Sequence, residues 1–203
     1  MSVTCAADMH THLPGHGDFA LVSCRDSGLS GYTSKEFHPW YLPEKFETLG
    51  ADFSEELKKF NALGEIGLDR LRGPDLTIQR RYFEALLEVA DALHKPVVIH
   101  NVRCEAEIFS ALKGFSSPVL FHGFCGGVRT AEKILDAGYF LSFNRISNAS
   151  VKDFLLSRGL ANVGIESDES GMNIEDISDE ISRILDMDMR TASFETFRKF
   201  LAL

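Results

Sequence analysis

The 203-residue sequence predicts an α/β protein folded as a single, slightly reduced (β/α)8 TIM barrel. Short apolar runs typical of buried parallel strands recur about eight times along the chain. Amphipathic helical patterns separate most of these runs. Strands that alternate with helices favour a parallel sheet with right-handed crossovers, and about eight such repeats favour a closed barrel.

The expected strands and helices follow one another along the whole chain. Extended segments are expected at residues 3–9, 19–24, 33–37, 62–66, 96–100, 118–122, 139–143 and 162–167. Helices are expected at 54–60, 77–94, 104–114, 128–137, 150–158, 173–186 and 190–202. Few residues separate the first two strands, so no full crossover helix fits there and the barrel is expected to begin irregularly.

Composition limits the classes of protein that this chain can belong to. With 44% hydrophobic and 25% charged residues, residues 1–203 are expected to form one domain with one sizeable core. There is no apolar run of about 18 residues and no signal-peptide pattern at the start, so no membrane association is expected. The four cysteines form no Cys-x-x-Cys pair, which favours free thiols and a cytoplasmic protein. No obligate protein partner is evident.

Six potential metal ligands lie at or just after the ends of apolar runs. Four are histidines and two are carboxylates: His10, His12, Glu65, His100, His122 and Asp168. If the runs are strands of one parallel sheet, these side chains meet at its carboxyl edge, where α/β enzymes build their active sites. A lone histidine at a strand end is more often structural, so the whole set, rather than any one member, predicts a divalent metal centre.

Four further motifs accompany these residues: His38-Pro39-Trp40, Gly64-Glu65-Ile66-Gly67-Leu68-Asp69, Lys95-Pro96-Val97-Val98-Ile99-His100 and His122-Gly123-Phe124. From Asp8 to about Asp168 the chain resembles the TatD-type metal-dependent hydrolases and deoxyribonucleases, within the amidohydrolase-like barrels. Glu166-Ser167-Asp168 stands where that family usually has Glu-Thr-Asp, and the chain is shorter than typical members. The resemblance therefore implies a compact subgroup.

The resemblance implies one or two divalent ions, with Zn²⁺, Mn²⁺ and Mg²⁺ as the candidates. The mixed imidazole and carboxylate ligands suit Zn²⁺, Mn²⁺ or a related divalent ion, whereas an all-oxygen shell would favour Mg²⁺. One ion would be held by His10, His12 and Asp168 and the other by His100 and His122, with Glu65 bridging the two. Such a centre lowers the pKa of bound water from about 15.7 toward 7. Asp168 and Glu65 are the expected catalytic carboxylates, and Asp168 is the expected proton acceptor.

Two further residues are expected to lie next to the metal ligands without binding the metal themselves. Glu166 shares a strand face with Asp168 and would support the site, or would instead pair with a core arginine. His38 would assist at the rim of the site, or would cap a turn before Pro39.

Arginines that follow the predicted strands point to a phosphate-bearing substrate, with DNA as one candidate. Six of them are placed in this way: Arg25, Arg70, Arg72, Arg103, Arg129 and Arg145. The planar guanidinium matches phosphate in a bidentate manner, and Arg103 and Arg145 are the preferred substrate contacts. The alternative is that the arginines neutralise nearby acids. The net charge of −9 disfavours broad binding to a nucleic-acid backbone, so nucleic-acid ends or small phosphoesters are expected.

The leading hypothesis is therefore a divalent-metal-dependent phosphodiesterase or deoxyribonuclease. A second hypothesis is amidohydrolase-type hydrolysis of an amide, ester or lactone, in which the arginines would be solvated surface. A third is a metal-binding partner module without turnover. The sequence disfavours the third hypothesis, because a module of that kind has no use for an open metal position.

Overall fold

The chain folds as the expected (β/α)8 barrel. The computed structural model describes residues 5–15, 17–26 and 28–203. Eight parallel strands follow one another in chain order around a closed barrel. They are β1 Asp8–Thr11, β2 Ala20–Cys24, β3 Tyr32–Lys35, β4 Ala62–Asp69, β5 Val97–Val102, β6 Val119–Phe121, β7 Phe140–Phe143 and β8 Val163–Ile165.

Helices follow most of the strands, as predicted. They are α1 Phe53–Leu57, α2 Leu76–Ala92, α3 Glu105–Ala111, α4 Val128–Asp136, α5 Ala149–Arg158, α6 Ile174–Leu185 and α7 Met189–Leu201. A short 3-10 helix, η1, covers Pro39–Tyr41. The residues group into two compact units, unit 1 being Met1–Val22 with Leu120–Leu203 and unit 2 being Ser23–Val119.

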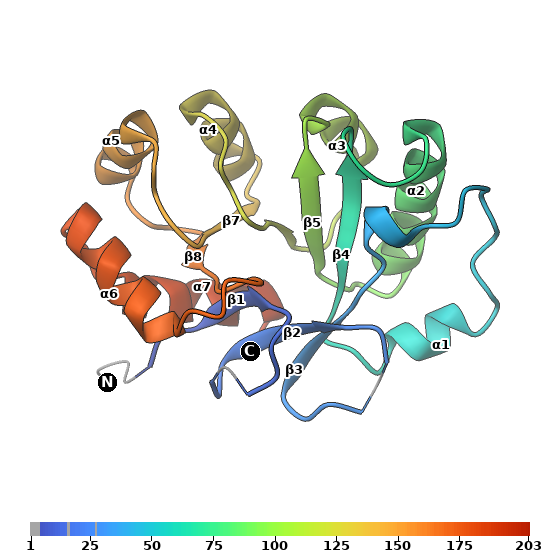
Figure 1. The fold of residues 1–203 in the computed structure, drawn as a ribbon, viewed down its shortest axis with the longest axis horizontal. Helices are drawn as coiled ribbons and strands as arrows, with labels where there is room; N and C mark the ends of the chain where they lie inside the picture. The colour runs from blue at the N-terminus through green and yellow to red at the C-terminus, as the bar shows by residue number, and fades with distance from the viewer. Residues whose placement is uncertain (1–4, 16, 27) are drawn as a thin grey trace. The chain divides into compact units, whose positions relative to one another are not determined.

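Unit 1 is held together by strands from both ends of the chain. Asp8 pairs with Ile165, so β1 and β8 are neighbours although 157 positions separate the two residues in the sequence. Helix α7 packs on both strands: the Ser193 hydroxyl donates to the Ala7 carbonyl at 2.6 Å and accepts from the Ile165 N–H at 3.2 Å. These buried hydrogen bonds fix α7 against the β1 and β8 strands (Figure 1).

Unit 2 is built around the long strand β4, which pairs with β3 on one side and β5 on the other. Helices α2 and α3 lie beside β4 and β5 (Figure 1). The buried Gln79 of α2 accepts from the Asp69 N–H at 2.8 Å and donates to the carbonyls of Asp69, Arg72 and Pro74. One amide side chain thus fixes the turn that follows β4.

Strand boundaries differ from the sequence-based expectation by a few residues, and the differences in β1, β4 and β5 bear on the site. The first strand was expected at 3–9, but β1 begins at Asp8, and residues 3 and 4 lie outside the described residues. Strands β4 and β5 continue past Glu65 and His100, because Ile66–Asp69 pairs with Ile99–Val102. Both side chains therefore project from within a strand rather than from its end.

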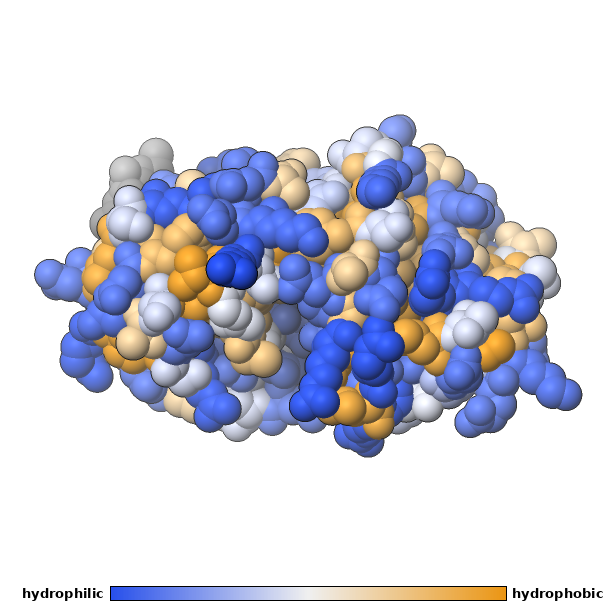
Figure 2. Space-filling model, turned by 90° about the horizontal axis from the view of Figure 1, so that it is seen from above, coloured by the Kyte–Doolittle hydropathy of each residue, from blue (hydrophilic) through white to orange (hydrophobic). Residues whose placement is uncertain are grey.

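Within the described residues, no helix has the length and apolar character needed to cross a membrane. The face shown in Figure 2 is largely hydrophilic, with hydrophobic residues in scattered groups.

The close approach of β4 and β5 at Gly67 predicts a large cost for any side chain there. Gly67 has φ +147°, and an added Cβ would lie 2.0 Å from the His100 carbonyl oxygen. Gly67→Ala should destabilise the fold by at least about 2 kcal/mol, because backbone strain of about 1–3 kcal/mol adds to overpacking. Thermal unfolding should show a Tm lowered by roughly 4–8 °C or more. Gly50→Ala is the control, since open space surrounds that position. Equal Tm values for the two variants would contradict this account.

Candidate metal centre

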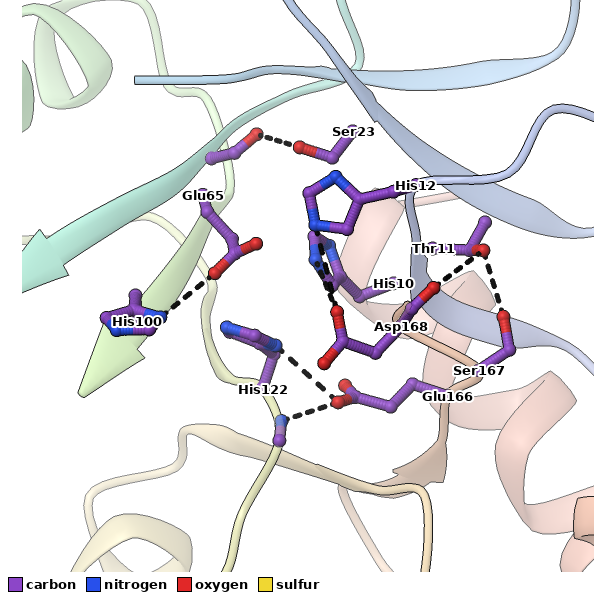
Figure 3. A network of polar contacts seen from close by, with 12 residues as sticks. His10, Thr11, His12, Ser23, Glu65, His100, His122, Glu166, Ser167 and Asp168 are labelled. Atoms are coloured by element: carbon purple, nitrogen blue, oxygen red, sulfur yellow. Dashed lines mark hydrogen bonds and ion pairs between the residues drawn. The ribbon is translucent and has the colours of Figure 1, made fainter. Parts of the chain in front are cut away.

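In unit 1, two histidines of the first strand region face one aspartate. The His10 Nε2 atom lies 3.9 Å and the His12 Nε2 atom 3.7 Å from Asp168 Oδ1. The two imidazole rings meet edge-on, with their centroids 4.9 Å apart. Figure 3 shows both rings turned toward Asp168. His10 is buried, whereas the side chains of His12 and Asp168 remain 23% and 29% exposed, so a substrate can reach this side of the cluster.

Backbone pairing beyond the ends of β1 and β8 produces this arrangement. Thr11 and Asp168 form an isolated parallel bridge. The Asp168 N–H donates to the His10 carbonyl at 3.0 Å, and the His12 N–H donates to the Asp168 carbonyl at 3.4 Å. Asp168 has φ +51°, in the left-handed region that non-glycine residues seldom adopt. Such strain commonly marks functional positions.

A buried network of hydrogen bonds joins the residues next to His10 and Asp168. Asp8 accepts hydrogen bonds from the Ser167 N–H at 3.0 Å and from the Ser167 hydroxyl at 2.6 Å. It also accepts from the His10 N–H at 3.2 Å, and Thr11 Oγ1 lies 2.9 Å from the Ser167 hydroxyl. Burial raises the pKa of Asp8 to about 7, although the hydrogen bonds from Ser167 act in the opposite direction.

A second carboxylate in unit 1 stands behind His122. Glu166 is fully buried, and its Oε1 atom lies 3.5 Å from His122 Nδ1 (Figure 3). Glu166 also accepts from the Gly123 N–H at 2.7 Å and from the Ser142 hydroxyl. Burial opposes ionisation of Glu166, but His122, His10 and the Ser142 hydroxyl outweigh it and hold the pKa of the carboxyl below its ordinary value. Glu166 therefore faces His122, and no arginine among the described residues pairs with it.

In unit 2, a cluster of imidazoles and carboxylates surrounds Glu65. Glu65 Oε1 lies 3.1 Å from His100 Nδ1 and 3.3 Å from His38 Nε2. The other ring nitrogen of His100, Nε2, lies 3.2 Å from Asp69 Oδ2. Trp40 donates its indole N–H to the same Asp69 oxygen at 2.5 Å. All these groups are buried or half-buried.

One residue of this cluster fits an alternative expected from the sequence, and another was missing from the sequence-based description. His38 does cap a turn, because its Nδ1 accepts from the Trp40 N–H at 3.1 Å, and its Nε2 also faces Glu65. Asp69 was not singled out, although it ends the Gly64–Asp69 motif. Burial of Asp69 favours its neutral form, but hydrogen bonds from Trp40 and the Leu71 N–H outweigh this effect and lower the pKa of its carboxyl.

The donor sets of both units fit a divalent ion. Ligand atoms of His10, His12 and Asp168 lie within 4.8 Å of one another, as do those of His122, Glu166 and Asp168 in unit 1. Ligand atoms of His38, Glu65 and His100 meet the same limit in unit 2. Imidazole nitrogens with carboxylate oxygens are the ligands that Zn²⁺ and Mn²⁺ accept.

The six arginines that were expected to follow strands divide into two groups. Arg25 pairs with Glu36 at 3.2 Å, Arg70 pairs with Glu107, and Arg72 lies over the Trp40 ring with its Cζ 3.5 Å from the centroid. The remaining three are exposed and form no ion pair within the described part of the chain: Arg103, Arg129 and Arg145. The neutralising role therefore fits Arg25 and Arg70, whereas the preferred substrate contacts Arg103 and Arg145 keep their guanidinium groups available.

Comparison with known proteins decides the family. The family model described as "TatD related DNase" matches residues 7–169, which is most of the chain. The chain belongs to the TatD related DNase family. An uncharacterized metal-dependent hydrolase of Buchnera aphidicola is 31% identical over 105 residues, 47% of this chain and 40% of that protein. The "Deoxyribonuclease Tat-D" of Schizosaccharomyces pombe is 28% identical over 95 residues, 44% of this chain and 30% of that protein. The chain spans less than half the length of the curated relatives that it matches.

Solved TatD structures share the fold at low identity. The TatD homologue YJJV of Escherichia coli superposes with a TM-score of 0.73 at 20% identity, covering 91% of this chain and 86% of that chain. A TatD family hydrolase of Entamoeba histolytica gives a TM-score of 0.72 at 13% identity, covering 98% and 99%. These likenesses support the barrel and its strand order.

The role of Glu166 behind His122 predicts an effect on metal affinity. Glu166→Gln keeps the size and one acceptor oxygen but removes the charge facing His122. Metal affinity should fall by roughly 10- to 100-fold, the usual effect of removing a carboxylate behind a histidine ligand. Competition with a chromophoric chelator measures this directly. Glu180→Gln, at an exposed position, is the matched control. Unchanged affinity in Glu166→Gln would exclude the orienting role.

Proposed function

We propose that this chain is a divalent-metal-dependent phosphodiesterase, a deoxyribonuclease acting near nucleic-acid ends or on small phosphoesters. The convergence of His10 and His12 on Asp168 carries this proposal, together with membership of the TatD related DNase family. Arg103 and Arg145, which form no ion pair with a described residue, favour a phosphate substrate over the amide, ester or lactone of the second hypothesis. The single domain and the cytoplasmic location remain predictions.

The proposed ligand set keeps the six residues expected from the sequence. His10, His12 and Asp168 would hold one ion and His100 and His122 a second, with Glu65 shared between them. The identity of the metal is left among Zn²⁺, Mn²⁺ and Mg²⁺, because the donor atoms suit more than one ion. A bound ion of this kind makes hydroxide available near neutral pH by lowering the pKa of water.

The residues of the chain supply the remaining functions. Asp168 is the proposed proton acceptor, because its carboxylate faces two imidazoles and is still partly exposed. The hydrogen bond between Asp8 and Ser167 would position the neighbouring residue Asp168, and Glu166 would orient the His122 ring. Arg103 and Arg145 are the proposed contacts to substrate phosphate, with their charge outside the ligand cluster.

The proposed function can be tested with metal-free protein reloaded with Mg²⁺, Mn²⁺ or Zn²⁺. We expect turnover of phosphodiesters, and little or none of neutral carboxylic esters. Carboxylic-ester or amide hydrolysis alone would favour the second hypothesis. Tight metal binding without turnover of any substrate would favour the third.

The role of Asp168 predicts a loss of turnover without a loss of folding. Asp168→Asn should lower kcat by at least about 10²-fold, the size expected for losing general-base help. The Tm of the metal-loaded protein should change little. Steady-state kinetics and thermal unfolding measure the two quantities, with exposed Asp153→Asn, on α5, as control. Near-normal turnover in Asp168→Asn would assign the proton acceptor elsewhere, to Glu65 or His38.

The phosphate-binding role of the arginines predicts an effect that depends on substrate charge. Arg103→Ala or Arg145→Ala should raise KM for a phosphodiester roughly tenfold or more, because a hydrogen bond to a charged group contributes about 1.5–3 kcal/mol. Lysine should rescue only part of the loss, because it keeps the charge without the planar fork. Arg158→Ala is the control, since this exposed side chain pairs with Asp136. Equal losses on charged and neutral substrates would make the two arginines structural.

A further inference from the structure

A pocket of about 160 Å³ lies between the β6–α4 and β7–α5 loops of unit 1. It adjoins His122, because the next residue, Gly123, lines the pocket and also donates to Glu166. Pockets for drug-sized ligands are larger, roughly 300–1,000 Å³. This one therefore has room for a single ring-sized group of a substrate.

An aromatic ring forms one wall of the pocket. Phe124 is half-buried, and its ring meets Phe143 edge-on with centroids 5.5 Å apart. Glycine at 126 makes room for this ring, since an added Cβ would lie 2.8 Å from Phe124 Cζ. Aromatic side chains placed in this way bind nucleobases by stacking, whichever base is present.

Polar groups without protein partners line the same pocket. Asn144 and Arg145 form no hydrogen bond or ion pair with any described residue. Asn148 differs, because its side chain already accepts from the Ser150 and Val151 N–H groups at the start of α5. The Asn144 amide can both donate to and accept from a base edge, and the Arg145 guanidinium matches a phosphate.

We infer that this pocket holds the base of one unpaired nucleotide adjoining the cleaved phosphodiester. The base lies against Phe124, Asn144 contacts its edge, and Arg145 binds a phosphate of the same nucleotide. Free phosphate would leave the aromatic wall unused, and a purely apolar group would leave Asn144 and Arg145 unused. A paired base cannot enter, because its partner strand would have to follow it into a ring-sized space. The inference rests on the proposed phosphodiesterase function.

A series of single-stranded oligonucleotides, each with one nucleotide made abasic, tests the inference with the metal-loaded enzyme. Wild-type kcat/KM should fall about 5- to 150-fold when the base that stacks is removed, the range for loss of one base–aromatic stack. Gly126→Ala displaces the Phe124 ring and should cause a similar loss on the unmodified strand, but little further loss on the abasic one. Gly127→Ala should match wild type, because its Cβ would meet open space. Neither glycine has a positive φ, so neither substitution strains the backbone.

The possible failures are distinguishable. If the enzyme cleaves every abasic strand as fast as the unmodified one, the pocket holds no base, while the phosphodiesterase function stands. If wild type cleaves no oligonucleotide at all, the nuclease part of the proposed function fails and the inference falls with it. If the Tm of Gly126→Ala is far below that of Gly127→Ala, Phe124→Leu takes the place of Gly126→Ala in the same series. Equal cleavage of base-bearing and abasic strands by wild type would still overturn the inference.

Discussion

The pairing of β1 with the segment that follows β8 is the constraint on which the unit 1 part of the site depends. The two segments come from opposite ends of the chain, and Asp8 joins them by accepting two hydrogen bonds from Ser167. This pairing sets the register in which His10 and His12 face Asp168. Burial of Asp8 is costly, as its raised pKa of about 7 shows. A cost of this kind is tolerated where it fixes the geometry of a functional site.

Both units place a carboxylate behind an imidazole by the same physical means. Glu166 is held by Gly123 and Ser142 while it faces His122. Asp69 is held by the Trp40 indole and two backbone N–H groups while it faces His100. Because these carboxylates are fixed by groups outside the donor set, the rings are oriented before any ion binds. Preorganisation of this kind reduces the free energy that ligand ordering would otherwise cost.

The barrel was predictable because most of the buried strands carry a short apolar run, and a run of this kind is visible in the sequence. The pairing of His10 with His12 was also predictable, since alternate residues of a strand share a face. The extension of β4 to Asp69 was not, because it depends on ladder hydrogen bonds to β5 rather than on its own residues. The same holds for the Trp40–Asp69–His100 contacts, which join three segments that only the fold brings together.

The distribution of charge is compatible with the proposed anionic substrate, although the chain as a whole is acidic. A net charge of −9 repels a long nucleic-acid backbone, which usually binds to an extended basic face. Three arginines that have no acidic partner among the described residues, Arg103, Arg129 and Arg145, lie in loops or first helical turns that follow strands β5, β6 and β7. Unpaired positive charge at such positions attracts phosphate locally, whereas the net negative charge of the chain repels it at longer range. Under these conditions a strand end gains the local attraction with the least repulsion, whereas a duplex crossing the surface meets repulsion along its length. For the proposed nuclease, the same electrostatics would therefore disfavour general nucleic-acid binding and favour the ends of strands.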